Sequence, residues 1–95
     1  MPYVSIRHKV ADYAKWKRAV HAFATSRKTS GETSFHVYRD RKSPNDLTVV
    51  SGWENAGKMQ KFIKSSELRK AMKGAGVLGK PVIQFFSKVE DLTVS

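Results

Sequence analysis

Apolar and polar residues alternate along the first ten residues of the chain and then change to a helical spacing. Every second residue from Val4 to Val10 is on one side, and this period of two predicts a β-strand with His8 on its apolar face. Asp12 stands where a helix N-cap belongs. Apolar residues then recur at spacings of three and four, as on one face of a helix: Tyr13, Trp16, Val20, Phe23 and Ala24. Gly31 is expected to end this helix, because glycine readily takes the left-handed conformation found there.

A β-hairpin is predicted next. Residues 34–41 and 47–54 both read as strands, and the KSPND segment between them has turn residues. Proline fixes φ, and Asn and Asp side chains bond to their own backbone. Gly52 lies inside the second of these strands, which predicts a bulge or a close backbone approach.

The last third of the chain repeats the order of helix and strand. Asn55 is a suitable cap for a helix from Ala56 to about Lys64, and either Ser65 or Ser66 can cap a further turn or two. Glycines at 74, 76 and 79 end the helical part, and residues 81–88, PVIQFFSK, read as a fourth strand. The order β-α-β-β-α-β predicts an α+β, ferredoxin-like domain spanning residues 1–95, with an antiparallel four-stranded sheet and the helices on one face.

Both faces of the predicted sheet carry apolar residues, although the helices cover only one of them. Depending on how the strands face, the residues left in water are Phe35 and Val37 or His36 and Tyr38, and Val82 and Phe86 or Ile83 and Phe85. An exposed apolar face usually marks an interface. We therefore expect a homodimer that pairs sheet against sheet.

The composition excludes some kinds of chemistry but does not indicate a particular reaction. The chain of 95 residues has no cysteine, which excludes disulfides and thiolate catalysis. The formal net charge of +10 is compatible with a polyanionic partner, but the cations are spread over the predicted helices and one turn. No signal peptide or membrane-spanning stretch is evident, so a cytoplasmic location is expected.

Several segments together resemble the dimeric α/β-barrel superfamily, which includes the antibiotic-biosynthesis-monooxygenase-like proteins. They are YVSIRHKVADYAKW at the start, SGWE at the end of the hairpin, and MQKFIKSSELRKAMKGAGV beyond it. The resemblance implies two ferredoxin-like chains that pair their sheets into a barrel, with each pocket between one chain's sheet and its own helices. Relatives of known activity include cofactor-free oxygenases of polycyclic phenols, haem-degrading oxygenases and isomerases, and the fold does not choose among them.

Haem degradation is disfavoured by the residues themselves. Haem-degrading relatives carry an asparagine on the first strand, a tryptophan in the second helix and a histidine after it. The matching positions here hold Arg7 or His8, Phe62 and Met72. No cofactor is therefore expected. The three histidines lie on separate elements without metal-binding spacing, so no metal site is expected either.

His8 is the candidate catalytic residue, because a histidine on an apolar strand face could transfer protons near neutral pH. The candidate substrate-binding residues are the aromatic and sulfur side chains expected around it: Tyr13, Trp16, Phe23, Trp53, Phe62 and Met72. All seven have an alternative role as ordinary core residues. Arg7 and Arg39 are candidates for an anionic group or for an ion pair.

The function expected from these observations is the binding of a small, planar, apolar or aromatic ligand between sheet and helices, by an enzyme of the cofactor-free monooxygenase type. A non-catalytic dimeric binding module is the alternative that stays open. A nucleic-acid-binding module has the same order of elements, but the third strand, LTVVSGWE, lacks the aromatic pattern that such modules need.

Overall fold

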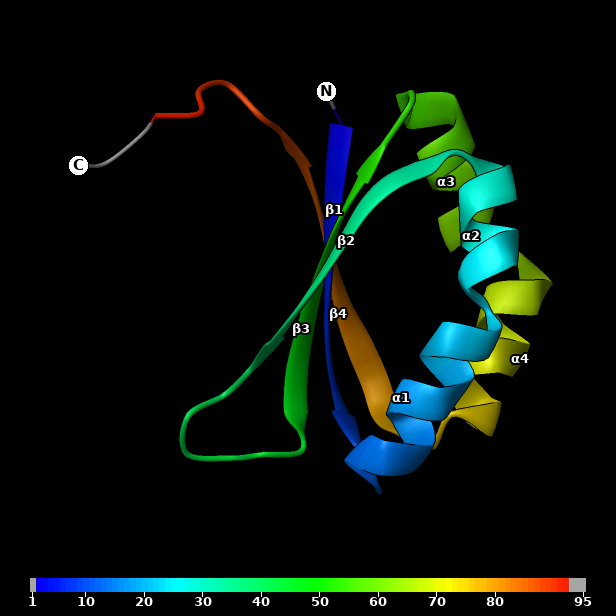
Figure 1. The fold of residues 1–95 in the computed structure, drawn as a ribbon, viewed down its shortest axis with the longest axis vertical. Helices are drawn as coiled ribbons and strands as arrows, with labels where there is room; N and C mark the ends of the chain where they lie inside the picture. The colour runs from blue at the N-terminus through cyan, green and yellow to red at the C-terminus, as the bar shows by residue number, and fades with distance from the viewer. Residues whose placement is uncertain (1, 93–95) are drawn as a thin grey trace.

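The computed structural model describes residues 2–92, which fold into one four-stranded antiparallel sheet with four helices on one face (Figure 1). The strand order is β2-β3-β1-β4. The elements are β1 (Pro2–Val10), α1 (Tyr13–Ala22), α2 (Ala24–Ser30), β2 (Glu32–Arg39), β3 (Asp46–Trp53), α3 (Ala56–Ile63), α4 (Ser66–Gly74) and β4 (Val77–Ser87). The predicted ferredoxin-like α+β architecture is confirmed.

β1 lies in the middle of the sheet, and its alternation decides which side of each strand faces the helices. Val4, Ile6, His8 and Val10 are all buried on the helix side. In the register of the sheet, Ile6 is opposite Val49 of β3 and opposite Ile83 of β4. The same face of all three strands therefore packs under the helices.

Each of the two predicted helical regions is divided into two helices. The first changes direction at Phe23, whose φ and ψ of −90° and 0° depart from helical values. The second stops at Lys64, and Ser65 then takes an extended conformation. Its hydroxyl accepts a hydrogen bond from the Leu68 amide and donates one to the Phe62 carbonyl, so one serine closes α3 and starts α4.

β4 begins four residues earlier than the predicted Pro81. The strand pairs with β1 from Val77 onward, but its register shifts opposite His8, between Arg7 and Lys9. Gly79 sits in this irregular stretch with φ of +67°, which glycine adopts at low cost. The glycine and the proline therefore mark a bulge inside the strand, where the sequence suggested a loop before it.

Gly52 lies at an irregularity in the pairing of β2 and β3, as its place inside a strand predicted, and side chains rather than backbone approach it closely. The register between β2 and β3 shifts from Glu32 to Ser34, opposite Gly52. A Cβ atom added there would lie 2.7 Å from Ser34 Oγ and 3.1 Å from Tyr3 Cε2. Any larger side chain would have to displace a neighbour on one of the flanking strands.

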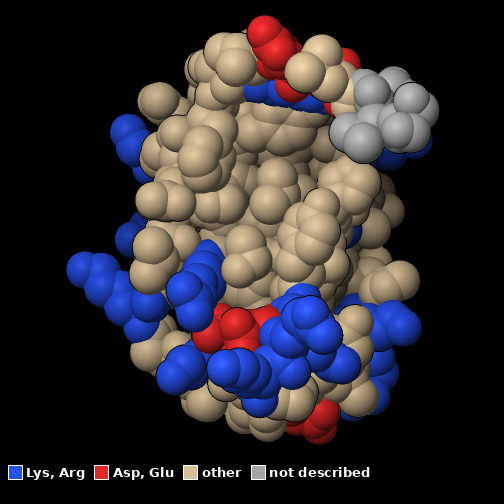
Figure 2. Space-filling view, turned by 90° about the vertical axis from the view of Figure 1, so that its left-hand side faces the viewer, with Lys and Arg blue, Asp and Glu red and all other residues tan. Residues whose placement is uncertain are grey.

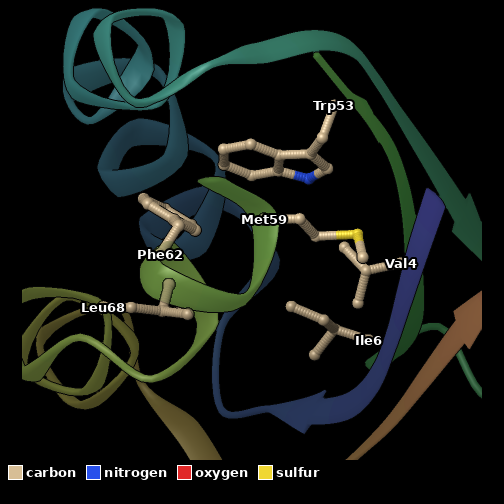
Figure 3. Packing of buried hydrophobic residues seen from close by; sticks show 6 residues of the cluster. All are labelled: Val4, Ile6, Trp53, Met59, Phe62 and Leu68. Carbon is tan, nitrogen blue, oxygen red and sulfur yellow. The ribbon is translucent and has the colours of Figure 1, made fainter. Parts of the chain in front are cut away.

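Two hydrophobic clusters fill the space between sheet and helices. In the first, the side chains of β1 and β3 meet those of α3 and α4 around Trp53 (Figure 3). Its buried members are Val4, Ile6, Trp53, Met59, Phe62 and Leu68. The second lies under α1 and contains Val10, Trp16, Leu47, Val49 and Ala75.

The opposite face of the sheet is not covered by any part of residues 2–92 (Figure 1). Its middle is free of Lys, Arg, Asp and Glu, and charged side chains gather mainly towards its two ends (Figure 2). Tyr38 and Val82 are each 58% exposed there, and Phe86 is 47% exposed. Of the two arrangements that the sequence left open, the strands thus place His36, Tyr38, Val82 and Phe86 on the uncovered side.

Candidate functional site

A cavity of about 80 Å³ lies between the sheet and the helices, where the two hydrophobic clusters meet. Its wall is mostly apolar and aromatic, and its polar lining residues are His8, Arg27 and Ser51. Ligand sites commonly have this composition, an apolar surface with a few polar groups that fix orientation.

His8 reaches the cavity from β1 and is 6% exposed. The centre of its ring lies 5.7 Å from that of Trp16 of α1. Among the hydrogen bonds of residues 2–92, neither Nδ1 nor Nε2 of His8 has a partner. Buried polar atoms are rarely left in this state. A buried imidazole without a hydrogen-bond partner in a cavity wall therefore indicates that a ligand group could bind to it.

Burial lowers the pKa of His8 from its ordinary value of 6.5, and the negative charge of Asp46 opposes this effect. The imidazole is therefore neutral at pH 7. In that form one ring nitrogen donates a hydrogen bond and the other accepts one. Such a group can take a proton from a bound hydroxyl and return it.

Two aromatic side chains form the part of the cavity wall near α3. Trp53 ends β3, and its Nε1 donates a hydrogen bond of 3.0 Å to Ser51 Oγ, which fixes the indole in the wall. Phe62 of α3 packs against it with ring centres 4.9 Å apart. Phe23, at the junction of α1 and α2, also packs against Phe62, with ring centres 5.9 Å apart. The wall is thus held in place by contacts among its own members.

The structure brings together most of the residues expected from the sequence. His8, Trp16, Phe23, Trp53, Phe62 and Met72 all line the cavity. Tyr13 does not. Its ring is stacked on Trp16 at 5.9 Å, and the guanidinium of Arg39 lies 4.2 Å above it. Tyr13 therefore lies outside the cavity, behind Trp16.

Tyr13 instead lines a second hollow of about 380 Å³, which we call the groove. It runs between α1, α2 and β2 and is lined by Tyr13, Trp16, Lys17, Val20, His21, Ala24, Arg27, Phe35 and Val37. Trp16, Val20, Arg27 and Phe35 line both spaces. These four side chains form the shared wall between cavity and groove.

The sequence analysis missed Arg27 and Glu32, a buried ion pair at this wall. Arg27 Nε donates to Glu32 Oε1 at 2.8 Å, and the two side chains are only 12% and 8% exposed. Burial raises the pKa of Glu32, although the hydrogen bond and charge of Arg27 and a hydrogen bond from Ser51 oppose it. The two residues are five positions apart, across the end of α2 and the start of β2. No helical or strand period reveals such a spacing.

The other polar candidates lie elsewhere. Arg7 is on the uncovered face of the sheet, where it donates to both carboxylate oxygens of Asp46. His36 is exposed on that same face, and His21 is exposed on α1. Within residues 2–92, no three His, Cys, Asp or Glu side chains come close enough together to hold a metal ion.

Comparison with solved structures shows that the fold is shared widely. SnoaB from Streptomyces nogalater, described as a cofactor-independent oxygenase, aligns with a TM-score of 0.78 and 13% identity over 96% of this chain and 95% of its own. A Bordetella bronchiseptica protein assigned as an antibiotic biosynthesis monooxygenase gives 0.75 and 20%, over 94% and 98%. A Deinococcus radiodurans protein of the same assignment gives 0.72 and 17%, over 100% and 99%.

Sequence comparisons give a family but no individual relative. Among curated protein sequences, none matches the chain. None of the helices in residues 2–92 is both long and apolar enough to cross a membrane. The model of the family "Antibiotic biosynthesis monooxygenase" matches residues 4–74, which include most of β1, the hairpin and all four helices. The chain therefore belongs to the antibiotic biosynthesis monooxygenase family.

Proposed function

We propose that this protein is a cofactor-independent oxygenase of planar aromatic compounds, acting as a homodimer. The observation that carries the proposal is His8, a buried imidazole with both ring nitrogens unpaired in the wall of an aromatic cavity. The fold shared with SnoaB, a cofactor-independent oxygenase by its description, supports the reaction class. Family membership supports it as well.

The proposed chemistry begins with a proton transfer. Neutral His8 accepts the proton of a phenolic or enolic hydroxyl, and the resulting anion is electron-rich enough to react with O₂ directly. For a ring CH₂ group oxidised to a ketone, one oxygen atom of O₂ becomes the carbonyl oxygen. The other leaves as water with the two hydrogens. Trp53 and Phe62 present apolar ring surfaces to the edge of the substrate that reaches His8.

The size of the site indicates how such a substrate would be seated. The cavity of about 80 Å³ is smaller than the ~150 Å³ that accommodates benzene in an engineered protein cavity. The adjoining groove, at about 380 Å³, falls within the range of small-molecule sites. A ligand of two or three rings would therefore lie mainly in the groove, with only the edge of one ring reaching the cavity at the shared wall.

The proposed dimer rests on the uncovered sheet face. Val82, Phe86 and Tyr38 are about half exposed there in a single chain. Large apolar side chains left exposed on one uncovered sheet face support an interface between proteins. A second copy of the same face would cover it and leave the cavity and groove on the far side of each sheet.

Oxygen uptake with 1,8-dihydroxyanthrone, a tricyclic phenol with a ring CH₂ group, tests the reaction. We expect uptake well above the rate in buffer or with heat-denatured protein, and its loss in His8→Gln. Uptake that is unchanged in His8→Gln would remove His8 from the mechanism. Binding of the anthrone without any added uptake would instead support a non-catalytic binding module.

A further inference from the structure

Arg27 has the position and the donors to bind a ligand at the shared wall. Its Nε is bonded to Glu32 and its Nη1 donates to the Val20 carbonyl at 2.6 Å, so the guanidinium is fixed from two sides. It lies over the ring of Phe35, 4.1 Å from the ring centre. Its Nη2 takes part in none of the hydrogen bonds found among residues 2–92. Donor capacity therefore remains at a point that borders both the cavity and the groove.

This arrangement is unusual for an arginine that only stabilises the fold. A buried ion pair contributes little net stability, because desolvation of the two charges offsets their attraction. Here it places a cation in the wall of an apolar site that otherwise presents only a neutral histidine and a serine hydroxyl. A guanidinium suits an oxygen anion, because its planar donors form charge-assisted hydrogen bonds.

We infer that Arg27, held by Glu32, binds an acidic oxygen of the ligand at the shared wall, so that the site selects planar aromatic anions over neutral aromatics of the same size. The inference rests on the proposed function, and it narrows the substrate class to planar phenols or enols that carry a second, ionised oxygen besides the hydroxyl that His8 deprotonates. Arg27 would hold the anionic oxygen while the rings lie against Phe35 and Trp16.

Two naphthoquinones of similar size and shape test the selection. At pH 7, 2-hydroxy-1,4-naphthoquinone is an anion and 2-methyl-1,4-naphthoquinone is neutral. Trp16 and Trp53 are the two tryptophans of the chain and both line the cavity, so quenching of their fluorescence reports binding there. We expect the wild-type protein to bind the hydroxyquinone about tenfold more tightly or better, the effect of one hydrogen bond to a charged group.

Comparing Glu32→Gln with a double variant that also changes Arg27 shows whether Arg27 causes the preference for the anion. Glu32→Gln removes the competing carboxylate and should tighten hydroxyquinone binding several-fold, because the guanidinium charge is then unshared. The double variant Arg27→Met with Glu32→Gln leaves no buried unpaired charge and should bind both quinones equally within about twofold. If neither variant folds, the wild-type preference still decides the inference, since equal affinities would overturn it.

Two further variants exclude other sources of the preference. Lys17→Met removes the second cation that lines the groove, and Arg18→Met removes an exposed cation outside it. The preference should survive both changes, and its loss in either variant would overturn the role of Arg27.

The quinone measurements also distinguish a failure of this inference from a failure of the proposed function. If neither quinone quenches the tryptophans, the proposed aromatic site fails together with the inference. If both quinones bind equally well, the aromatic site stands and only the selection by Arg27 is wrong.

Discussion

His8 occupies a position where an apolar residue would serve the fold better. Its ring is buried beside Trp16 and forms no hydrogen bond within residues 2–92. A buried polar group without a partner costs roughly 1–3 kcal/mol. We therefore expect His8→Leu to raise the free energy of unfolding by about 1 kcal/mol or more at pH 7.5, as measured by urea titration. A less stable His8→Leu protein would mean that the imidazole is satisfied after all.

The pH dependence of stability provides a second measurement on the same variant. Because burial lowers the pKa of His8 in the folded state, the unfolded chain binds the proton more readily. The wild-type protein should thus keep its full stability above the unfolded value of 6.5 and lose some as the pH falls below it. Glu32, with a raised pKa, gives the opposite slope just above 4.5. It is present in both proteins, so the difference between wild type and His8→Leu isolates the histidine.

Gly52 illustrates how closely β2 and β3 approach at the end of the hairpin that is far from its turn. Its amide donates to Ser34 Oγ at 3.1 Å, and an added Cβ would come within 2.7 Å of that oxygen. Gly52→Ala should lower the free energy of unfolding by about 1–3 kcal/mol through overpacking. Gly74, at the end of α4, is the matched control, because its added Cβ meets nothing within 4 Å. Gly74→Ala should be neutral or stabilise by up to ~1 kcal/mol, and equal losses in both variants would contradict the packing argument.

At the scale of elements, the break between α3 and α4 depends on one hydroxyl. Ser65 Oγ accepts from the Leu68 amide and donates to the Phe62 carbonyl, whereas Ser66 is exposed in the first turn of α4. Ser65→Ala should therefore cost about 0.5–2 kcal/mol of stability by thermal or urea unfolding. Ser66→Ala should change stability by less than about 0.5 kcal/mol, as surface substitutions usually do. A larger loss in Ser66→Ala would reverse the assignment of the cap.

The elements that the sequence predicted well are those with a clear period or a clear cap. β1 was evident from its alternation, and α1 and α3 begin at the predicted caps, Asp12 and Asn55. The break at Phe23 was not predictable, because the helical spacing of apolar residues continues through it. The start of β4 was placed too late, because Gly79 and Pro81 signal a loop and a bulge equally well.

The site was predictable only where its residues belong to the apolar face of an element. His8, Trp16 and Phe62 fall on such faces and line the cavity. Tyr13 falls on the same helix face as Trp16, yet it does not line the cavity. Its ring stacks on Trp16, which does line the cavity, and the guanidinium of Arg39 lies over the Tyr13 ring. The Arg27–Glu32 pair depends on the tertiary path of the chain around Gly31, which no local pattern encodes.

At the scale of the whole molecule, the charge is distributed unevenly between the two layers. The four helices carry ten of the 18 Lys and Arg residues and only one acidic residue, Glu67. The middle of the uncovered sheet face is uncharged (Figure 2). Two chains that meet through this face would therefore keep most of their positive charge on opposite outer surfaces. Beyond about 10 Å at ordinary salt their repulsion is largely screened.

This arrangement makes the proposed dimer testable with a single charge. Val82 is on the uncovered face of the edge strand β4 and is 58% exposed in one chain, so Val82→Glu should leave the fold intact. In a sheet-to-sheet dimer it would bury a carboxylate next to Arg7, whose guanidinium is already bonded to Asp46, so one net negative charge stays uncompensated on each side of the interface. An uncompensated buried charge costs about 3 kcal/mol or more, which weakens association more than 100-fold.

Lys70→Gln, on the exposed face of α4, changes the net charge by the same amount and should leave association unchanged. Sedimentation at micromolar concentration should find wild type and Lys70→Gln at twice the chain mass of 10.7 kDa and Val82→Glu at that mass. A wild-type protein that sediments as a single chain, or a dimer indifferent to Val82→Glu, would show that the uncovered face has another use.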